Sequence, residues 1–183
     1  METPRPRRVT LVLGGVRSGK SRYAQRLAEA ATGRVAFVAT ATAFDDEMRV
    51  KIQRHRATRP AAWLTVEEPL ELAAVLAQTE CELVLIDCLT IYAANLLHAT
   101  GEDEGAARQR MTELCAAIEN ARCDVVLVSN EVGSGVVPAY ALGRQFRDAL
   151  GELNQMVAAV ADDVVLLVAG LPLALKGSIR RLA

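Results

Sequence analysis

Short runs of aliphatic residues alternate along the chain with longer segments in which apolar and polar residues mix. The short runs predict strands buried on both faces of a sheet, at residues 9–13, 34–39, 83–86, 125–128 and 164–168. The longer segments predict helices, at residues 18–31, 44–56, 69–78, 104–121 and 138–161. This alternation indicates an α/β fold, with a mostly parallel central sheet and helices on both faces. Residues 171–176 follow the last run so closely that they predict an antiparallel edge strand.

A chain of 183 residues suits one domain with one hydrophobic core, so we expect residues 1–183 to form a single domain. Residues 1–8 hold two prolines and three arginines and are expected to be flexible. The net charge of −1 gives no reason to expect nucleic acid as a partner. The longest apolar run, residues 164–175, is too short to span a bilayer, and the first residues lack the pattern of a signal peptide. We therefore expect a cytoplasmic protein.

The four cysteines form no CxxC pair, and the chain has only two histidines, His55 and His98. This pattern argues against a zinc site. Three of the cysteines lie in or beside apolar runs, as free thiols of a reducing cytosol do.

Residues 14–21 read Gly-Gly-Val-Arg-Ser-Gly-Lys-Ser and match the phosphate-binding pattern G-x-x-x-x-G-K-[ST]. A predicted strand runs into the motif and a predicted helix runs out of it, which makes a chance glycine-rich turn the weaker interpretation. In such a loop Lys20 reaches the β- and γ-phosphates, and the Ser21 hydroxyl binds Mg²⁺. The motif predicts a nucleotide site without identifying the reaction, and its residues are Gly14, Gly15, Val16, Arg17, Ser18, Gly19, Lys20 and Ser21.

Asp87 follows the aliphatic run 83–86, where the carboxyl edge of a parallel sheet presents its side chains. A carboxylate there can hold Mg²⁺ directly or through water, so Asp87 and Ser21 are the candidate metal ligands. The alternative is an aspartate that only caps its strand.

His55 shares one face of the predicted helix 44–56 with Phe44, Met48 and Ile52. One interpretation is a packed histidine on a charged surface helix. The other is a nucleophile, because a neutral imidazole can attack an α-phosphorus and hold a nucleotidyl group as a phosphoramidate. Neighbouring cations would stabilise the phosphate charge, and four lie close in sequence: Lys51, Arg54, Arg56 and Arg59. Spacing alone does not choose between the two.

Taken together, these motifs resemble the bifunctional adenosylcobinamide kinase / adenosylcobinamide-phosphate guanylyltransferase family. The most specific pieces are the phosphate loop in the form Gly-Gly-x-Arg-Ser-Gly-Lys-Ser and the run Asn-Glu-Val-Gly-x-Gly at residues 130–135, followed by Pro138. The other matching pieces occur in family order over nearly the whole chain, at residues 38–43, 45–48, 52–55, 59–60, 63–67, 87–90, 95–97, 144–148 and 154–155.

The resemblance implies a RecA-like P-loop fold, a trimer and two reactions. ATP or GTP phosphorylates the aminopropanol hydroxyl of adenosylcobinamide, a corrinoid. GTP then guanylylates His55, and the cobinamide phosphate takes the GMP to give adenosylcobinamide-GDP. Besides the phosphate loop, the implied nucleotide contacts are Thr40, Ala41, Thr42, Arg56, Ala57, Thr58, Arg59, Glu67 and Asp87. Glu131 is a further candidate, as an acid, a base or a residue near the metal.

Two departures from the family pattern concern the histidine segment. Arg54 stands where members often have a first histidine, but His55, the second, is kept. Residues 56–59 read Arg-Ala-Thr-Arg, where members often have Lys-Asp-Gly-Arg, so a glycine of that loop is missing. Two rival functions stay open: a generic small-molecule P-loop kinase without a role for His55, and a nucleotide-gated switch protein.

Overall fold

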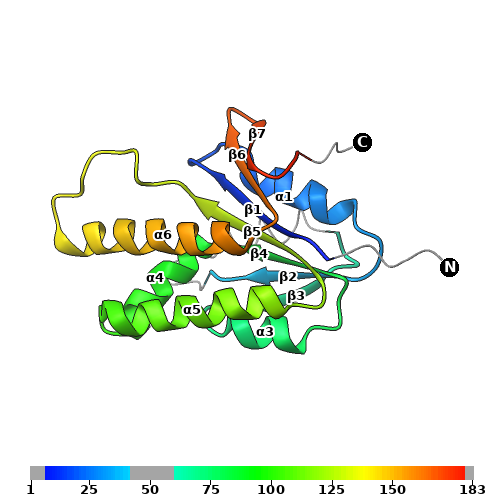
Figure 1. The fold of residues 1–183 in the computed structure, drawn as a ribbon, viewed down its shortest axis with the longest axis horizontal. Helices are drawn as coiled ribbons and strands as arrows, with labels where there is room; N and C mark the ends of the chain where they lie inside the picture. The colour runs from blue at the N-terminus through cyan, green and yellow to red at the C-terminus, as the bar shows by residue number, and fades with distance from the viewer. Residues whose placement is uncertain (1–6, 42–59, 180–183) are drawn as a thin grey trace.

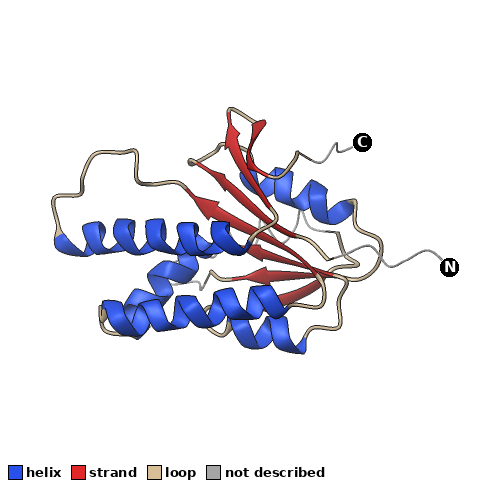
Figure 2. Ribbon diagram, viewed as in Figure 1, coloured by secondary structure: helices blue, strands red, loops and turns tan. Residues whose placement is uncertain are grey.

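The computed structural model of the chain describes residues 7–41 and 60–179. Within them, strands form one sheet in the order β3-β2-β4-β5-β1-β6-β7. The strands are β1 (Val9–Gly14), β2 (Val35–Ala39), β3 (Leu64–Glu67), β4 (Leu83–Asp87), β5 (Asp124–Asn130), β6 (Asp163–Val168) and β7 (Leu171–Lys176). Neighbouring strands are parallel except β6 and β7, which form an antiparallel hairpin. The predicted α/β class and antiparallel edge strand are therefore confirmed (Figures 1 and 2).

Two hydrophobic cores lie on the two faces of the sheet, and helices cover both faces (Figure 1). One face is covered by α3 (Leu72–Gln78), α4 (Leu89–Ala99), α5 (Glu104–Asn120) and α6 (Ala141–Val160), and we call it the four-helix face. The other is covered by α1 (Lys20–Glu29), and we call it the α1 face. Side chains alternate along each strand, so the central strands, buried on both sides, read as unbroken aliphatic runs.

Two elements of the structure were not predicted, β3 and α4. The side chains of β3 are half-buried or exposed, so this edge strand shows no aliphatic run. Only Cys88 separates β4 from helix α4. Helix α4 is apolar on most of its surface, so the sequence shows no clear change from a strand pattern to a helical pattern. The predicted helix 44–56 lies outside the described residues.

Helix α3 begins at Leu72, later than predicted, because the preceding turn has its own hydrogen bonds. Glu68 Oε1 accepts from the backbone N–H groups of Leu70 at 2.9 Å and Glu71 at 2.8 Å. The Glu68 side chain thus stabilises a separate turn before the helix, which the mixed apolar and polar pattern did not distinguish from helix.

Arg8 ties the beginnings of the parallel strands together at the amino edge of the sheet. Its guanidinium forms an ion pair with Asp163, with Nε 2.6 Å from Oδ2, and this bond raises the pKa of Arg8. Its backbone N–H donates to Asp124 at 2.7 Å, and Asp163 also accepts from the N–H of Ser178 at 2.9 Å. Arg8 is therefore anchored, while residues 1–6 of the segment expected to be flexible lie outside the description.

The thiols and the hydropathy of the helices add two observations. All four cysteines are free; Cys115 and Cys123 are buried, whereas Cys81 and Cys88 are half-buried. In the part of the chain that the structure describes, no helix is long and apolar enough to cross a membrane.

Candidate nucleotide site

The phosphate loop connects β1, which ends at Gly14, to α1, which starts at Lys20. Gly19 has φ 95°, a left-handed conformation that glycine adopts without strain. A Cβ atom on Gly14 would lie 2.8 Å from the carbonyl oxygen of Leu167, so this position also requires glycine. Two glycines of the motif are thus explained by backbone geometry, as the phosphate-binding interpretation expects.

The loop is closed by contacts with its own helix and with the β6–β7 turn. Lys20 Nζ donates to the carbonyl of Gly15 at 3.2 Å, which holds the ammonium group against the loop. The backbone N–H of Gly170, in the β6–β7 turn, donates to the carbonyl of Ser18 at 2.9 Å. The loop conformation therefore depends on a hairpin that is far away in sequence.

The sheet register brings the predicted acidic residues to the same edge as the loop. Ala39 pairs with Glu67 on one side and with Asp87 on the other. Ala39 belongs to the core of the α1 face, and paired residues in a parallel sheet project to the same side. Glu67 and Asp87 therefore lie on the α1 face, where the chain leaves β1 for the phosphate loop.

Thr40, a predicted nucleotide contact, is buried and uses its hydroxyl within the protein. Its Oγ1 donates to the carbonyl of Cys88 at 2.8 Å and accepts from the N–H of Cys88 at 2.9 Å. Asn95 Nδ2 donates to the carbonyls of Thr40 at 3.0 Å and Pro69 at 3.1 Å. The Thr40 hydroxyl thus holds the ends of β2 and β4 together rather than pointing toward a ligand.

Of the other predicted nucleotide contacts after β2, the structure describes only Ala41. Ala41 follows Thr40 and is half-buried. Thr42, His55, Arg56, Ala57, Thr58 and Arg59 lie outside the described residues.

The side chains that hold this edge together were missed by the sequence patterns. Asn95 on α4 joins the segments after β2 and β3, as described above. Thr90 on α4 and Asn154 on α6 bond to the end of β5, at 2.8 Å and 3.0 Å. All three residues fall in the quoted family pieces, but nothing in their local pattern indicates which distant strand they reach.

Glu131 is exposed and turns into its own loop. Its Oε1 accepts from the N–H of Gly133 at 2.6 Å, and its own N–H donates to the carbonyl of Gly14 at 3.3 Å. The residue is next to the phosphate loop, but its carboxylate is used to shape residues 131–133.

Cys88, next to Asp87, is not suited to be a nucleophile. Burial, and then the negative charge of Asp87, raise the pKa of the Cys88 thiol. A thiol with a raised pKa stays neutral at pH 7, and the neutral thiol is a poor nucleophile.

The oxygen ligands available fit Mg²⁺. Ser21 lies in the first turn of α1, and Asp87 ends β4 on the same face. Mg²⁺ prefers such oxygen ligands and keeps several waters, so one hydroxyl and one carboxylate are sufficient protein ligands beside phosphate oxygens. Among the described residues, no three His, Cys, Asp or Glu side chains gather as they would around zinc.

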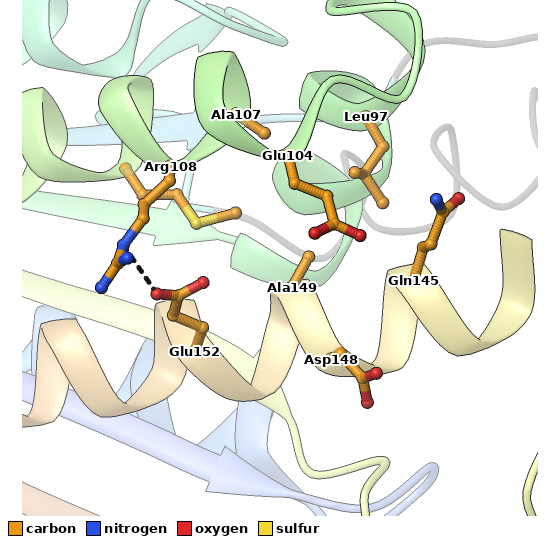
Figure 3. Close-up of a pocket in the computed structure, with 9 residues that line it drawn as sticks. Leu97, Glu104, Ala107, Arg108, Gln145, Asp148, Ala149 and Glu152 are labelled. Atoms are coloured by element: carbon orange, nitrogen blue, oxygen red, sulfur yellow. Dashed lines mark ion pairs between the residues drawn. The ribbon is translucent and has the colours of Figure 1, made fainter.

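A pocket of about 150 Å³ lies elsewhere, among α4, α5 and α6 (Figure 3). It is lined by the carboxylates of Glu104, Asp148 and Glu152 and by the apolar side chains of Leu97 and Ala149. Arg108 Nε forms an ion pair with Glu152 at 2.9 Å. None of the predicted site residues in the described part of the chain lines this pocket, and the pocket does not include the phosphate loop.

Sequence comparisons identify relatives over almost the whole chain. A family model described as cobinamide kinase / cobinamide phosphate guanyltransferase matches residues 10–175. The chain is 45% identical over 171 residues to a Pseudomonas aeruginosa protein named bifunctional adenosylcobalamin biosynthesis protein CobP, covering 91% of this chain and 96% of that protein. It is 40% identical over 179 residues to the Escherichia coli K12 protein named bifunctional adenosylcobalamin biosynthesis protein CobU, covering 91% and 98%.

Solved structures of low sequence identity share the fold. An ATPase from the type III secretion system of pathogenic bacteria superposes with a TM-score of 0.56 at 13% identity, covering 91% of this chain and 56% of the ATPase. The chain thus spans little more than half of that protein. The RadB recombinase superposes with a TM-score of 0.50 at 17% identity, covering 87% and 73%. These likenesses confirm the RecA-like P-loop fold and carry no information about the reaction.

Proposed function

Because the chain belongs to the cobinamide kinase / cobinamide phosphate guanyltransferase family, we propose that both reactions of this family use the carboxyl edge of the sheet on the α1 face. The protein is a kinase and nucleotidyltransferase of cobalamin biosynthesis. It phosphorylates the aminopropanol hydroxyl of adenosylcobinamide with ATP or GTP. It then transfers GMP from GTP to this phosphate, which yields adenosylcobinamide-GDP and pyrophosphate. The observation that supports the proposed location is the phosphate loop between β1 and α1.

In the kinase step the phosphate loop binds and orients the nucleoside triphosphate. Loop N–H groups and the N-terminus of α1 attract the phosphate oxygens, and Lys20 neutralises the β- and γ-phosphates. Ser21 and Asp87 hold Mg²⁺, which neutralises the charge that develops during phosphoryl transfer. Glu67, on the same face of the sheet, contacts the nucleotide from the other side of Asp87.

In the guanylyl step His55 is the nucleophile. An imidazole nitrogen attacks the α-phosphorus of GTP, a P–N bond forms, and pyrophosphate leaves. The corrinoid phosphate then attacks the same phosphorus, and the P–N bond breaks to regenerate the histidine. Support comes from the sequence pattern around His55, where Lys51, Arg54, Arg56 and Arg59 lie close in sequence. The nucleotide contacts that the family resemblance implies also include Thr42, Arg56, Ala57, Thr58 and Arg59.

The protein assembles as a trimer through the β6–β7 hairpin. Val168, Leu171, Leu173 and Leu175 are each more than half exposed. Val168 pairs with Leu171, and Leu173 lies two positions further along β7, so these three side chains lie on the same face of the hairpin. An exposed apolar surface of this kind is typical of an interface. We place the trimer in the cytoplasm, where reducing conditions keep thiols free, as the four cysteines are.

A covalent-labelling experiment tests the guanylyl mechanism. GTP labelled at the α-phosphorus should leave one acid-labile, alkali-stable GMP per chain, because protonation of the imidazole makes it a good leaving group. The label should map to His55, and EDTA should prevent its formation. His55→Ala should lose the label and adenosylcobinamide-GDP while still forming adenosylcobinamide phosphate.

The chain contains its own control, because His98 is the only other histidine. His98→Ala should keep the label, since His98 lies exposed near the end of α4. Label on His98, a lysine or a serine would contradict the mechanism. A protein that takes no label but still phosphorylates adenosylcobinamide would be a P-loop kinase without the guanylyl step.

A further inference from the structure

Asn130 occupies the middle of the proposed nucleotide site. It is the last residue of β5, the strand between β1 with its phosphate loop and β4 with Asp87. In the register of β1 and β5, Asn130 pairs with Gly14. Val128 belongs to the core of the α1 face, and the side chain two positions further along a strand projects to the same side. The Asn130 side chain therefore lies on the α1 face, beside the start of the phosphate loop.

The backbone of Asn130 is held firmly, whereas the buried end of its side chain is unsatisfied. Its N–H donates to Thr90 Oγ1 at 2.8 Å, and its carbonyl accepts from Asn154 Nδ2 at 3.0 Å. Asn130 Oδ1 is buried and has no hydrogen-bond partner among the described residues. Buried polar atoms are almost always paired, so an unpaired one needs a physical reason. A bound ligand that completes the hydrogen bonds of the amide is such a reason.

The neighbouring polar residue does not share these properties. Glu131 is exposed, and its carboxylate is bonded to the N–H of Gly133 at 2.6 Å. Ser129, just before Asn130, also has a buried hydroxyl without a partner among the described residues. It pairs with Leu13, which belongs to the core of the four-helix face. Of the three polar residues that follow the aliphatic run of β5, Asn130 is therefore the one with unsatisfied hydrogen-bonding capacity on the α1 face.

We propose that Asn130 is a further catalytic residue of the kinase step, whose side-chain amide forms a hydrogen bond with the terminal phosphate of the nucleotide. The assignment rests on the proposed function of the phosphate loop. Asn130 Nδ2 donates to a γ-phosphate oxygen, and Oδ1 gains a donor from the Lys20 ammonium or from water bound with the nucleotide. The hydrogen bonds from Thr90 and Asn154 hold the backbone of Asn130 in place before the nucleotide binds, so the strand end that carries the amide needs little reorganisation during phosphoryl transfer.

The test compares triphosphate and diphosphate binding, because only a residue at the terminal phosphate changes the ratio of the two affinities. Calorimetry with a non-hydrolysable triphosphate analogue and with the diphosphate, for adenosine and guanosine, gives this ratio. We expect Asn130→Ala to lower the triphosphate preference about tenfold, as for the loss of one hydrogen bond to a charged group. Asn130→Asp should lower it further, because a carboxylate repels phosphate. The turnover number of the kinase should fall in both variants.

Asn120→Ala is the matched control and should leave the ratio within about twofold, because this exposed amide donates to the carbonyl of Ala116 at 2.8 Å at the end of α5, away from the phosphate loop. An unchanged ratio in both Asn130 variants would overturn the assignment. So would an equal loss of diphosphate and triphosphate binding with a lower melting temperature, since that pattern indicates a structural role. If the unsubstituted protein binds neither nucleotide, the phosphate-loop proposal itself fails, and the assignment of Asn130 falls with it.

Discussion

At the scale of single residues, Lys20 shows how the phosphate loop is prepared for its ligand. Its ammonium group donates to the carbonyl of Gly15 at 3.2 Å, a bond between a charged donor and a neutral acceptor. Phosphate oxygens are stronger acceptors than a carbonyl, so a bound nucleotide draws the ammonium away from Gly15. The bond is exposed, so its loss costs the fold little.

We therefore expect Lys20→Ala to reduce the rate of the kinase step below detection. The rate of guanylylation should fall by at least about a hundredfold. The melting temperature should stay within about 3 °C of the unsubstituted protein. Initial rates of both reactions, with a thermal melt for each variant, measure these effects. Lys176→Ala is the control, because Lys176 caps the end of α6 through the carbonyls of Ala158 and Ala159. A folded Lys20 variant with unchanged rates would refute the assignment.

At the scale of elements, the two edges of the parallel sheet have different roles, one in the candidate site and the other in stability. The carboxyl edge carries the candidate site, whereas the amino edge is held by Arg8 and the aspartates around it. Asp163 is almost completely buried, with 1% of its side chain exposed, and its ion pair with Arg8 has one half-exposed partner. Removal of Arg8 leaves a buried carboxylate with the N–H of Ser178 as its remaining donor.

Arg8→Ala should lower the free energy of unfolding by about 1–3 kcal/mol, below the range for a fully buried pair because Arg8 is partly solvated. The turnover number per folded molecule should not change, because Arg8 is at the edge opposite the site. Urea unfolding and active-site titration measure the two quantities. Arg108→Ala removes an ion pair with Glu152 in which both side chains are exposed, and it should cost less than about 1 kcal/mol. Equal costs for the two variants would contradict the argument.

At the scale of the whole molecule, the β6–β7 hairpin has two roles. Its turn supports the phosphate loop through the bond from Gly170 to Ser18. One face of the hairpin also presents apolar side chains to solvent, including Leu171, 72% exposed, and Leu173, 55% exposed. We expect this face to be covered in the proposed trimer.

Leu173→Glu should convert the trimer to monomers of 19.7 kDa, because a charge in a dry apolar interface is costly to desolvate. The monomer should remain folded, since position 173 is exposed within one subunit. Light scattering coupled to size-exclusion chromatography measures the mass. Val136→Glu is the control, at an apolar position that is 96% exposed in the segment between β5 and α6. Dissociation by Val136→Glu instead would move the interface to that segment.

By itself, the sequence determined the features that depend on neighbouring residues. The aliphatic runs predicted the central strands, and residues 14–21 predicted the phosphate loop. Both predictions succeed because strand burial and loop conformation depend on short stretches of neighbouring residues. The family pieces extended this to both activities, which the comparisons confirm at the level of the family. The local pattern failed at β3 and α4, where exposure of the strand and uniform hydrophobicity of the helix removed the periodic signal.

Tertiary structure alone decided which distant residues meet at the carboxyl edge. The strand order puts β5 between β1 and β4, so that Asn130 comes between Gly14 and Asp87, and no local pattern encodes this order. Likewise, the sequence suggested that Thr40 contacts the nucleotide, whereas in the fold its hydroxyl forms hydrogen bonds with the backbone of Cys88. The physical reason is that strand pairing and side-chain hydrogen bonds join segments distant along the chain, and their partners are set by the packing of the whole sheet.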